Sequence, residues 1–472
     1  MRGDADFDVL LIGAGQAALP LAGALSAAGR RVAVAERRHL GGSCVNFGCT
    51  PSKAVIASAR AAHQARRGAA YGLRIPQVEV DFPAVLGRAR SLLLETRGHL
   101  LRGFAPGGNP RLLEGHARLA GREAGVFRVD VGGTSCTARQ VVLDTGTRTA
   151  FPPIPGLERL DVLHAGNWLD RPELPEHLAI LGAGFVGLEM AQFYRRMGSR
   201  VTVLEKSRRI LKAEDADVAA ALQAMLESEG IQLRMATRVE RVTQRKGGGL
   251  HLATSSLGAR GHLDATHLFV AAGRRPNTDD LGLDSVGLRL PRSGFVPVNA
   301  RLATPVKGLW AAGDVRGGAM FTHTAWDDFR VLESQLLGDG SRTTRRLTPY
   351  ALFTDPELGR VGITEEQARR WPRRVIMGRF EMRRNSKARE RGDTVGFVKV
   401  LYEERSERLL GAAVLAADGS ELVHLLVDLM TAGAPASALR DAVHIHPTLA
   451  EAVQSAVTPP AVMRLAGRAA RR

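Results

Sequence analysis

Cysteine is scarce in this chain, with three residues among 472. That number is too small for the disulfide scaffold of a small secreted protein. No uninterrupted apolar run reaches about 18 residues, so the sequence predicts no helix that spans a bilayer. The N-terminus places acidic residues before a short apolar run and has no signal-peptide pattern. We therefore expect a soluble protein that begins at Met1 in the reducing cytoplasm.

Aromatic residues are also few, at 5% of the chain, whereas the formal net charge is +17. Clustered Lys and Arg side chains can neutralise nucleic-acid phosphates. Here the basic residues are scattered, and few rings are available to stack on bases. We interpret the charge as an Arg-rich solvated surface, and the terminal RLAGRAARR as a short basic tail. We expect no nucleic-acid partner and no membrane partner.

The remaining composition is that of a globular protein, with 44% apolar and 24% charged residues. A chain of 472 residues is too long for one hydrophobic core. We expect two to four domains.

An internal repeat indicates how these domains are built. The order of strand, glycine turn, helix and second strand occurs in FDVLLIGAGQAALPLAGALSAAGRRVAVAE and again in HLAILGAGFVGLEMAQFYRRMGSRVTVLE. Each landmark recurs 169 positions later, from 13 to 182 in the first pair. The pairs are Gly13 and Gly182, Gly15 and Gly184, Ala18 and Gly187, Gly29 and Gly198, and Glu36 and Glu205.

Each landmark has a physical purpose in binding a dinucleotide. The first glycine allows a tight turn, the second lets the backbone approach a pyrophosphate, and the third position must be small so that helix and strand can pack closely. The pyrophosphate then lies against free N–H groups at the helix N-terminus. The acidic residues that end the second strands, Glu36 and Glu205, suit ribose hydroxyls. Two complete copies predict two bound dinucleotides.

The stretch GGSCVNFGCTPSK places Cys44 and Cys49 just after the first repeat. A metal site needs about four ligands, and only His39 and His63 lie nearby in the sequence, so we expect no metal. Buried packing residues are an alternative, because free cysteine is often buried. The segment also predicts a helix start, where a thiolate is stabilised and its pKa falls. This favours a redox pair.

GGSCVNFGCTPSK resembles the redox-active segment of the pyridine nucleotide-disulfide oxidoreductases, which include dihydrolipoamide dehydrogenase, glutathione reductase and mercuric reductase. The resemblance extends over nearly the whole chain. LDTGTRTAFPPIPG and FVAAGRRPNTDDLGL resemble the two crossings between the FAD and nicotinamide domains, and GLWAAGDVRGG resembles the second FAD motif. YALFTDPELGRVGITEEQA and HIHPTLAEAV resemble parts of the dimerisation domain. One departure is Asp144, which stands where the family usually has a small residue.

The resemblance implies an α/β fold with two Rossmann-like dinucleotide-binding domains and a C-terminal α+β dimerisation domain. The FAD domain is expected at residues 1–150 and 277–345, the NAD(P) domain at 151–276 and the dimerisation domain at 346–472. The protein would be a homodimer that holds one FAD per subunit and binds NAD(P)H. It would pass electrons from NAD(P)H through the flavin to the cysteine pair and on to a small disulfide, or in the reverse direction.

The resemblance also assigns roles around the cysteines. Cys49 would face the flavin as the charge-transfer thiolate, and Cys44 would attack the substrate. Lys53 would approach the flavin and pair with Glu189. Phe185 stands where several relatives have an aromatic gate over the nicotinamide site.

A proton partner is implied in the dimerisation domain. Because an attacking thiol must lose a proton and a leaving thiolate must gain one, thiol exchange benefits from an acid–base group. By resemblance, His446 would supply it from the other subunit, oriented by Glu451. His444 is interpreted as a supporting or packing residue.

The resemblance and the repeat together predict a set of cofactor-binding residues. The expected set is Gly13, Gly15, Ala18, Glu36, Gly42, Ser43, Lys53, Thr145, Gly146, Gly182, Gly184, Phe185, Gly187, Glu205, Gly273, Gly313 and Asp314. A carboxylate at Glu205 would bond the 2′-hydroxyl of NADH and repel the 2′-phosphate of NADPH, so we expect NADH to be preferred. Lys206, Arg208 and Arg209 follow closely and could meet a phosphate.

Several substrates remain open. The acid–base pair favours a disulfide such as lipoamide, whereas PSKAVIASARAAH resembles the mercuric reductase branch. The chain lacks the C-terminal cysteine pair and the N-terminal metal-binding domain of that branch, so we expect no efficient Hg(II) reduction. A flavin-dependent transhydrogenase or quinone reductase would need no disulfide, and a non-catalytic relative would have lost one of the active-site residues. Cys136, in a β-rich part of the FAD domain, is interpreted as a bystander.

Overall fold

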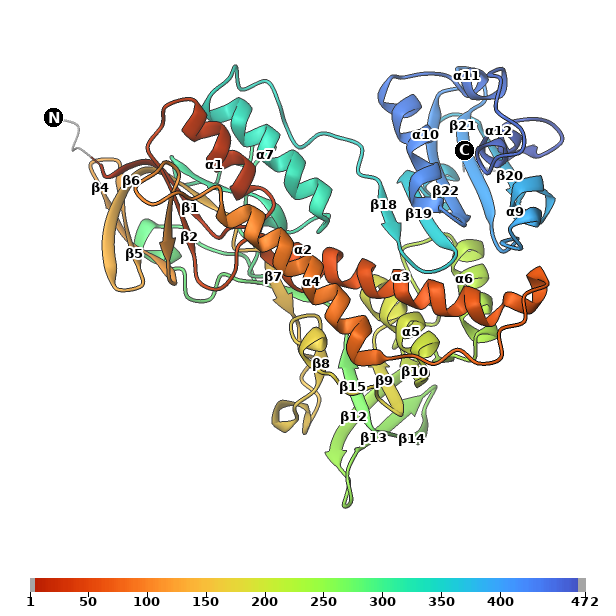
Figure 1. The fold of residues 1–472 in the computed structure, drawn as a ribbon. Helices are drawn as coiled ribbons and strands as arrows, with labels where there is room; N and C mark the ends of the chain where they lie inside the picture. The colour runs from red at the N-terminus through yellow and green to blue at the C-terminus, as the bar shows by residue number, and fades with distance from the viewer. Residues whose placement is uncertain (1–4, 466–472) are drawn as a thin grey trace.

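The computed structural model describes residues 5–465 and consists of three parts, each built around its own main sheet (Figure 1). Most of the predicted basic tail, residues 466–472, lies outside the described residues. The mixed α/β architecture expected from the sequence is confirmed. Within the described range, no helix is long and apolar enough to cross a membrane.

The first part is a seven-stranded sheet that contains the first repeat. Its strands are β1 (Phe7–Ile12), β2 (Val32–Glu36), β3 (Arg111–Glu114), β4 (Ala117–Glu123), β5 (Val126–Val131), β6 (Thr134–Leu143) and β17 (Leu309–Ala311). The order is β3-β2-β1-β6-β5-β4, with β17 also paired to β6. The apolar runs at residues 9–12 of β1 and 32–35 of β2 are typical of parallel strands buried on both faces. Helices α1 (Ala18–Ala27) and α7 (Thr322–Leu336) pack side by side on this part (Figure 1).

The second part contains the second repeat. Its parallel sheet has the order β11-β10-β9-β15-β8. The bounds are β8 (Leu163–His164), β9 (His177–Leu181), β10 (Arg200–Leu204), β11 (Gln232–Arg234) and β15 (His267–Val270). Helices α5 (Phe185–Met197) and α6 (Ala216–Ser228) pack into the core on one face. The meander β12 (Thr237–Gln244), β13 (Leu250–Ser256) and β14 (Ala259–Ala265) covers the other.

The two crossings between these parts lie side by side. Strand β7 (Thr147–Thr149) leaves the first part and pairs antiparallel with β16 (Arg274–Pro276), which returns to it. Both flanking glycines have left-handed backbone, with φ +64° at Gly146 and +129° at Gly273. Glycine adopts such angles without steric cost, so it suits the tight turns at this double crossing.

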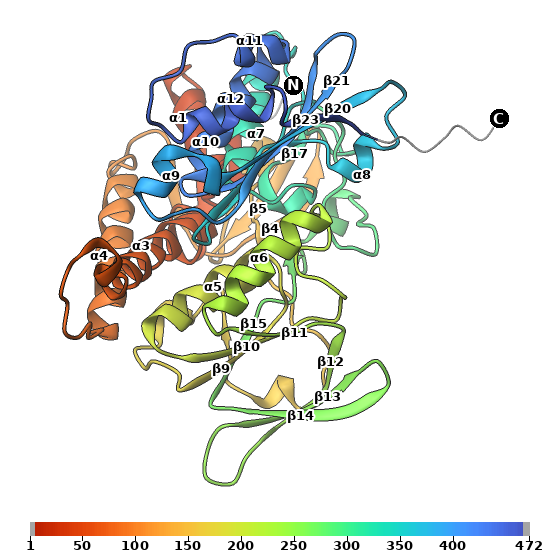
Figure 2. The same cartoon turned by 90° about the vertical axis from the view of Figure 1, so that its right-hand side faces the viewer.

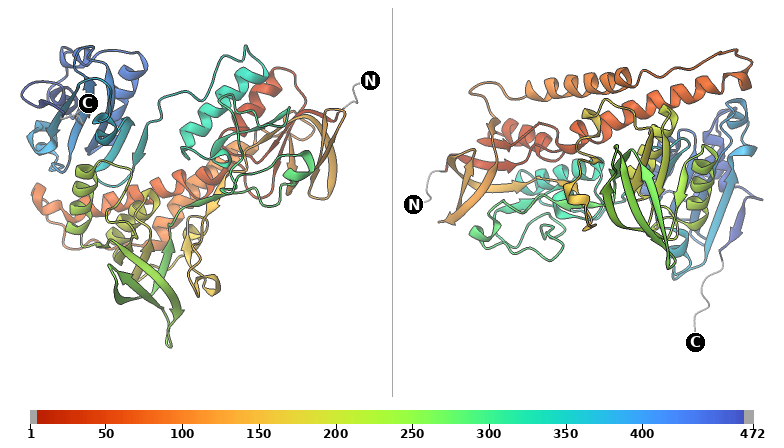
Figure 3. Two further views of the ribbon diagram at one scale, coloured as in Figure 1. Left: turned by 180° about the vertical axis from the view of Figure 1, so that it is seen from behind. Right: turned by 90° about the horizontal axis from the view of Figure 1, so that it is seen from below.

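Two long helices connect the cysteine segment to the second part. After α2 (Gly42–Asn46), helix α3 (Cys49–Arg66) runs against α4 (Phe82–Leu101) and α5 (Figure 3). The carboxylate of Asp81 caps α4 by accepting the N–H of Ala84 at 2.9 Å. Phe82 then packs its ring 6.0 Å from that of Phe193 on α5. The segment is thus held against the second part by ordinary core packing.

The third part is a six-stranded antiparallel sheet in the order β18-β19-β22-β21-β20-β23 (Figure 2). Its strands are β18 (Tyr350–Leu352), β19 (Glu357–Gly362), β20 (Val375–Glu381), β21 (Phe397–Glu403), β22 (Leu409–Ala416) and β23 (Val462–Arg464). The helices include α8 (Glu365–Ala368), α9 (Ser386–Glu390), α10 (Gly419–Thr431), α11 (Ala436–Arg440) and α12 (Ala450–Ala456). A separate apolar core joins α10 and α12 to the sheet.

Candidate active site

Cys44 and Cys49 lie on adjacent helices that follow β2. Cys44 is on α2, and α3 begins at Cys49. Gly41 and Gly42 precede them with φ of +92° and +61°, a backbone conformation that favours glycine. A Cβ atom on Gly42 would lie 3.1 Å from the Cα of Gly15. The cysteine segment therefore passes directly over the glycine turn of the first repeat.

The two thiols share a hydrogen bond and differ in acidity. This bond lowers the pKa of Cys49 to about 6 against the opposing effect of burial, with further help from Thr322 and Lys53. The Thr322 hydroxyl oxygen is 3.2 Å from Cys49 Sγ. The same shared bond, burial and the charge on Cys49 raise the pKa of Cys44. These shifts favour a single negative charge on the pair, with Cys49 as the more acidic thiol.

Lys53 connects this pair to the second part. Its ammonium Nζ lies 2.8 Å from Glu189 Oε2 on α5 and 4.4 Å from the ring centre of Phe353. Glu189 Oε1 accepts the backbone N–H of Phe353 at 3.0 Å. The structure thus brings Cys44, Cys49, Lys53 and Glu189 into one site.

The carboxyl ends of β1, β6 and β17 meet at one edge of the first sheet, beside the glycine turn of the first repeat. A Cβ atom on Gly13 would lie 2.4 Å from the carbonyl oxygen of Asp144, so only glycine fits there. Gly13 and Gly15 place backbone without side chains ahead of α1, where a pyrophosphate can approach. Asp314 follows β17 and accepts a hydrogen bond from Thr147 Oγ1 at 3.0 Å.

The acidic residue at the end of β2 stands beside the same turn. Glu36 accepts the N–H of Ala14 at 2.9 Å through Oε2 and that of Arg38 at 2.8 Å through Oε1. These bonds fix its carboxylate where it can meet ribose hydroxyls. The residues present therefore fit an FAD, with Gly13, Glu36 and Asp314 around it.

Other predicted residues of this cradle have structural contacts as well. Thr145 donates its hydroxyl to the carbonyl of Asn277 at 2.9 Å, across the double crossing. Ala18 is fully buried at the start of α1, and Ser43 is exposed on α2. Gly313, with φ +67°, begins the turn that carries Asp314.

The second repeat forms an equivalent cradle at the carboxyl ends of β9 and β15. Gly182 has φ +108°, and a Cβ atom there would lie 2.6 Å from the carbonyl oxygen of Ala271. A Cβ atom on Gly187 would lie 2.0 Å from the Gly182 oxygen, so α5 packs too closely for a side chain. Glu205 Oε2 accepts the N–H of Ala183 at 2.9 Å.

Phe185 lies in an aromatic cluster that sequence reasoning did not anticipate. Its ring is 5.5 Å from Tyr350 and 6.0 Å from Phe321, and these two rings are stacked 5.6 Å apart. The three rings come from three distant parts of the chain. Thr322, which contacts Cys49, was missed for the same reason, because no local pattern marks a residue that contacts the site only through the fold.

His446 and Glu451 lie apart from the cysteines. His446 Nδ1 is 2.9 Å from Glu451 Oε1, and Glu451 Oε2 accepts the N–H of Thr448 at 2.8 Å. The Thr448 bond, followed by the bond to His446, lowers the pKa of Glu451. The His446 side chain is 68% exposed. Within residues 5–465 of this chain, no hydrogen bond or ion pair joins it to Cys44 or Cys49.

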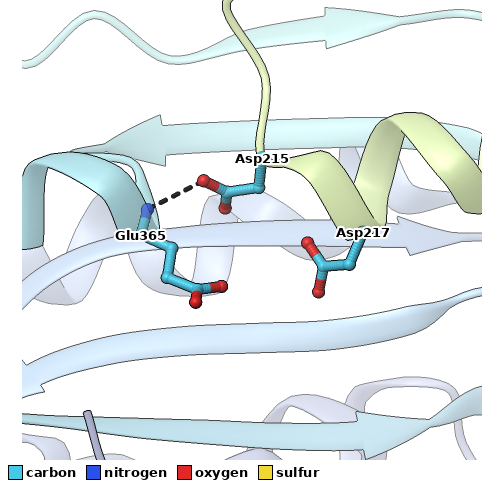
Figure 4. A group of neighbouring side chains, drawn as sticks. All are labelled: Asp215, Asp217 and Glu365. Atoms are coloured by element: carbon cyan, nitrogen blue, oxygen red, sulfur yellow. Dashed lines mark hydrogen bonds between the residues drawn. The ribbon is translucent and has the colours of Figure 1, made fainter. Parts of the chain in front are cut away.

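One group of carboxylates, Asp215, Asp217 and Glu365, resembles a metal site by its spacing (Figure 4). Their oxygens converge on the ammonium group of Lys399, at 3.2, 2.6 and 2.9 Å. Lys399 is fully buried, so its charge must be balanced there. The cluster is a structural ion network between α6 and the third part, and its cation is already present.

Comparisons with known proteins agree with this geometry. The family model for pyridine nucleotide-disulphide oxidoreductases matches residues 7–328, and the model for the dimerisation domain of these enzymes matches residues 348–457. The chain is 32% identical over 452 residues to the probable pyridine nucleotide-disulfide oxidoreductase RclA of Escherichia coli, covering 95% of this chain and 98% of RclA. It is 34% identical over 465 residues to a dihydrolipoyl dehydrogenase of Cupriavidus necator, covering 95% and 97%.

A solved structure gives the same result. The HOCl-induced flavoprotein disulfide reductase RclA from Escherichia coli aligns with a TM-score of 0.86 and 32% identity, over 96% of this chain and 99% of that one. The matches span the dinucleotide cradles, the cysteine segment and the dimerisation domain. This chain therefore belongs to the pyridine nucleotide-disulfide oxidoreductases, FAD-dependent enzymes that transfer electrons between NAD(P)H and a disulfide.

Proposed function

We propose that Cys44 and Cys49 form the redox disulfide, with Cys49 facing the flavin and Cys44 facing the substrate. The observation that carries this proposal is the position of Cys49 at the start of α3, where its Sγ lies 3.2 Å from Thr322 Oγ1 and Lys53 is one helical turn away. The lowered pKa of Cys49 makes it the resident thiolate, and the raised pKa of Cys44 makes it a thiol that needs a base. Bound FAD supplies the two-electron connection between the nicotinamide and this pair.

The reduced pair can then reduce a disulfide by two exchanges. A base removes the proton of Cys44, whose sulfur attacks one substrate sulfur and forms a mixed disulfide, and the first substrate thiolate leaves. The Cys49 thiolate attacks Cys44 Sγ, closes the Cys44–Cys49 disulfide and releases the second thiolate. Lys53 stabilises the Cys49 thiolate throughout, and Glu189 holds Lys53 in place.

The proton partner that we propose is His446 of the partner subunit, which would take the proton of Cys44 and return it to the leaving thiolate. Glu451 would orient this imidazole through Nδ1 and leave Nε2 for the transfer. Exposure of the neighbours supports coverage by a second copy, since Val443 is 100% and Ile445 is 79% exposed beside His446. The dimerisation domain indicates a homodimer, and the active sites would be shared between its subunits.

We further propose that NADH is preferred over NADPH. Although burial opposes ionisation, hydrogen bonds from Ala183 and Ser207 outweigh it and lower the pKa of Glu205. The resulting carboxylate suits a 2′-hydroxyl and repels a 2′-phosphate. Of the basic residues that follow, Arg209 already donates to the carbonyls of Lys212 and Glu214, at 2.8 and 3.0 Å.

We propose the domain boundaries 1–150 with 277–345 for FAD, 151–276 for NAD(P) and 346–472 for dimerisation. Strand pairing supports this division, because each of the three main sheets draws its strands from within one of these domains. We also expect the enzyme to work in the cytoplasm, where thiols are kept reduced.

The substrate that we propose is a low-molecular-weight disulfide, as the dihydrolipoyl dehydrogenase relatives suggest. A second candidate is a thiophilic metal ion, because two solved structures of RclA are described as Cu(II) complexes. Thiolate ligands suit copper in its reduced state. Lipoamide, glutathione disulfide, quinones, Hg(II) and Cu(II), each assayed with NADH and NADPH, distinguish these candidates.

An anaerobic titration tests the disulfide itself. The enzyme should take up four electrons per subunit, two more than its flavin alone accepts, and a long-wavelength charge-transfer band should develop after the first two. Cys44→Ser should retain a thiolate next to the flavin, whereas Cys49→Ser should lose the band. Both variants should lose disulfide turnover. Retention of the band in Cys49→Ser would overturn the assignment of the two sulfurs.

A further inference from the structure

Asp144, the residue that departs from the family pattern, lies at the start of α1. It directly follows β6, and its side chain points to the first helical turn. Its Oδ2 accepts the N–H groups of Ala17 at 3.2 Å and Ala18 at 2.9 Å. The residue is only 7% exposed. A carboxyl oxygen therefore occupies a position at a helix N-terminus that attracts anions.

Two glycines of the FAD motifs make room for this carboxyl group. A Cβ atom on Gly15 would lie 2.6 Å from Asp144 Oδ2, and one on Gly313 would lie 2.6 Å from Oδ1. The side chain is thus enclosed between the first and the second FAD motif. A negative charge on Asp144 would therefore lie beside the place where the pyrophosphate of FAD must bind, and would repel it.

The surroundings of Asp144 disfavour a negative charge. Burial raises its pKa to about 8, in opposition to the two backbone hydrogen bonds, and the carboxylates of Asp314 and Asp328 raise it further. No Lys or Arg forms an ion pair with Asp144 within the part of the chain that the structure describes. The charged groups of the surrounding elements are Glu36 at the end of β2, Arg274 on β16, Asp314 and Arg316 after β17, Asp328 on α7, and Arg346 ahead of β18. Arg274 lies 3.7 Å from Asp314, and Arg316 and Arg346 are bound to Asp328.

The second repeat shows that the fold does not need a carboxyl group at the position of Asp144. Ala271 follows β15 as Asp144 follows β6, and its N–H donates to Leu181 at 2.9 Å, as that of Asp144 does to Ile12. No atom lies within 4 Å of a Cβ built on Gly184, the counterpart of Gly15. The carboxyl group is a feature of the FAD cradle alone.

We propose that Asp144 is a positioning residue for FAD. As a neutral carboxylic acid it holds the first turn of α1 without adding charge to the pyrophosphate site. When it loses its proton to solvent, two negative groups compete for the same helix terminus, and FAD is bound less tightly.

The test is FAD release from the holoenzyme as a function of pH, followed by flavin fluorescence after dilution. For the wild type, the apparent Kd of FAD should rise above about pH 8, by up to about tenfold per pH unit. Asp144→Asn keeps an oxygen acceptor of the same shape and cannot ionise. It should bind FAD as tightly as the wild type at pH 7 and should not show this rise.

Two further measurements make the result decisive. In the infrared spectrum of the wild type at pH 7, the carbonyl band of a protonated buried carboxyl group should be present, and it should be absent from Asp144→Asn. Ala271→Asp, the matched variant of the second repeat, should make NADH binding weaker and pH-dependent while FAD binding stays unchanged. Three results would each overturn the proposal. The first is the same pH dependence of FAD binding in wild type and Asp144→Asn, and the second is weaker FAD binding by Asp144→Asn at pH 7. The third is the absence of the carbonyl band from the wild type.

Discussion

The two βαβ units of this chain build the same turn from different neighbours. In each unit the first glycine has left-handed backbone, +97° at Gly13 and +108° at Gly182. In each, the terminal glutamate accepts the N–H of the residue after that glycine, at 2.9 Å from both Ala14 and Ala183. This common hydrogen bond ties the end of the second strand to the turn. The glutamate therefore shapes the cradle before it meets any ribose.

The units differ in what fills the space beside the second glycine. In the first unit the carboxyl group of Asp144 fills it, next to Gly15, and in the second unit the space beside Gly184 is open. The third landmark differs too, since Ala18 is accommodated where Gly187 leaves no room. A cofactor that stays bound can share its site with a buried side chain, whereas one that exchanges in every turnover benefits from a bare helix end. The same glycine motif thus serves two different kinds of binding.

The largest expected effect is on NADH binding, and it follows from the third landmark, which is Ala18 in the first unit and Gly187 in the second. Gly187→Ala would place a Cβ atom 2.0 Å from the Gly182 oxygen, so α5 must move away from β9. Overpacking of this kind costs about 1–3 kcal/mol. We expect a lower Tm and NADH binding weakened at least about tenfold, because α5 supplies the helix end that meets the pyrophosphate. FAD content should not change.

Ala18→Gly is the matched control. It removes only one buried methyl group from the equivalent position, at a cost of about 1 kcal/mol. Thermal unfolding and NADH titration of both variants measure the contrast. Equal NADH affinity in Gly187→Ala and wild type would show that the displacement of α5 does not affect the pyrophosphate site.

The glutamates offer a second comparison. Glu205→Ala removes the charge expected to exclude a 2′-phosphate and leaves Lys206 and Arg208 in place. The ratio of kcat/KM for NADPH over NADH should rise about tenfold. Glu36→Ala should leave this ratio unchanged and weaken FAD binding by a similar factor. Glu205→Gln separates charge from hydrogen bonding, because its amide oxygen can still accept from Ala183. A ratio unaltered in both Glu205 variants would contradict the proposed NADH preference.

The sequence predicted those features that depend on local pattern. The repeat located both cradles, because a tight turn needs glycine at fixed places and a ribose partner needs an acid at the end of the strand. The fold class, the family and its electron-transfer chemistry followed from six ordered motifs and are confirmed. The individual roles of Cys44 and Cys49, which the titration above tests, and the role of His446 stay predictions.

Contacts between distant segments could not be predicted in this way. Thr322 is 273 positions from Cys49. No spacing in the sequence indicates that the first residue of α7 contacts a thiol at the start of α3. Asp144 departs from the family pattern in the sequence itself, yet its bonds to Ala17 and Ala18 depend on three strand ends that meet at one edge of the sheet. Contacts between side chains at the ends of separate strands can be identified only once the fold is known.

The smallest of the three expected effects is a shift in the pKa of Cys49, and it concerns Thr322 at the start of α7, whose hydroxyl contacts this thiol. Because the pKa of Cys49 is lowered, its thiolate exists above about pH 6 and is lost as the pH falls through that value. The hydroxyl of Thr322 stabilises the thiolate, so Thr322→Val should raise the pKa by about one unit. The charge-transfer band of the two-electron-reduced enzyme should then disappear at a higher pH.

Thr322→Ser keeps the hydroxyl and should follow the wild type. A midpoint that is the same in Thr322→Val, Thr322→Ser and wild type would mean that the hydrogen bond with Cys44 and the charge of Lys53 account for the lowered pKa of Cys49 without Thr322.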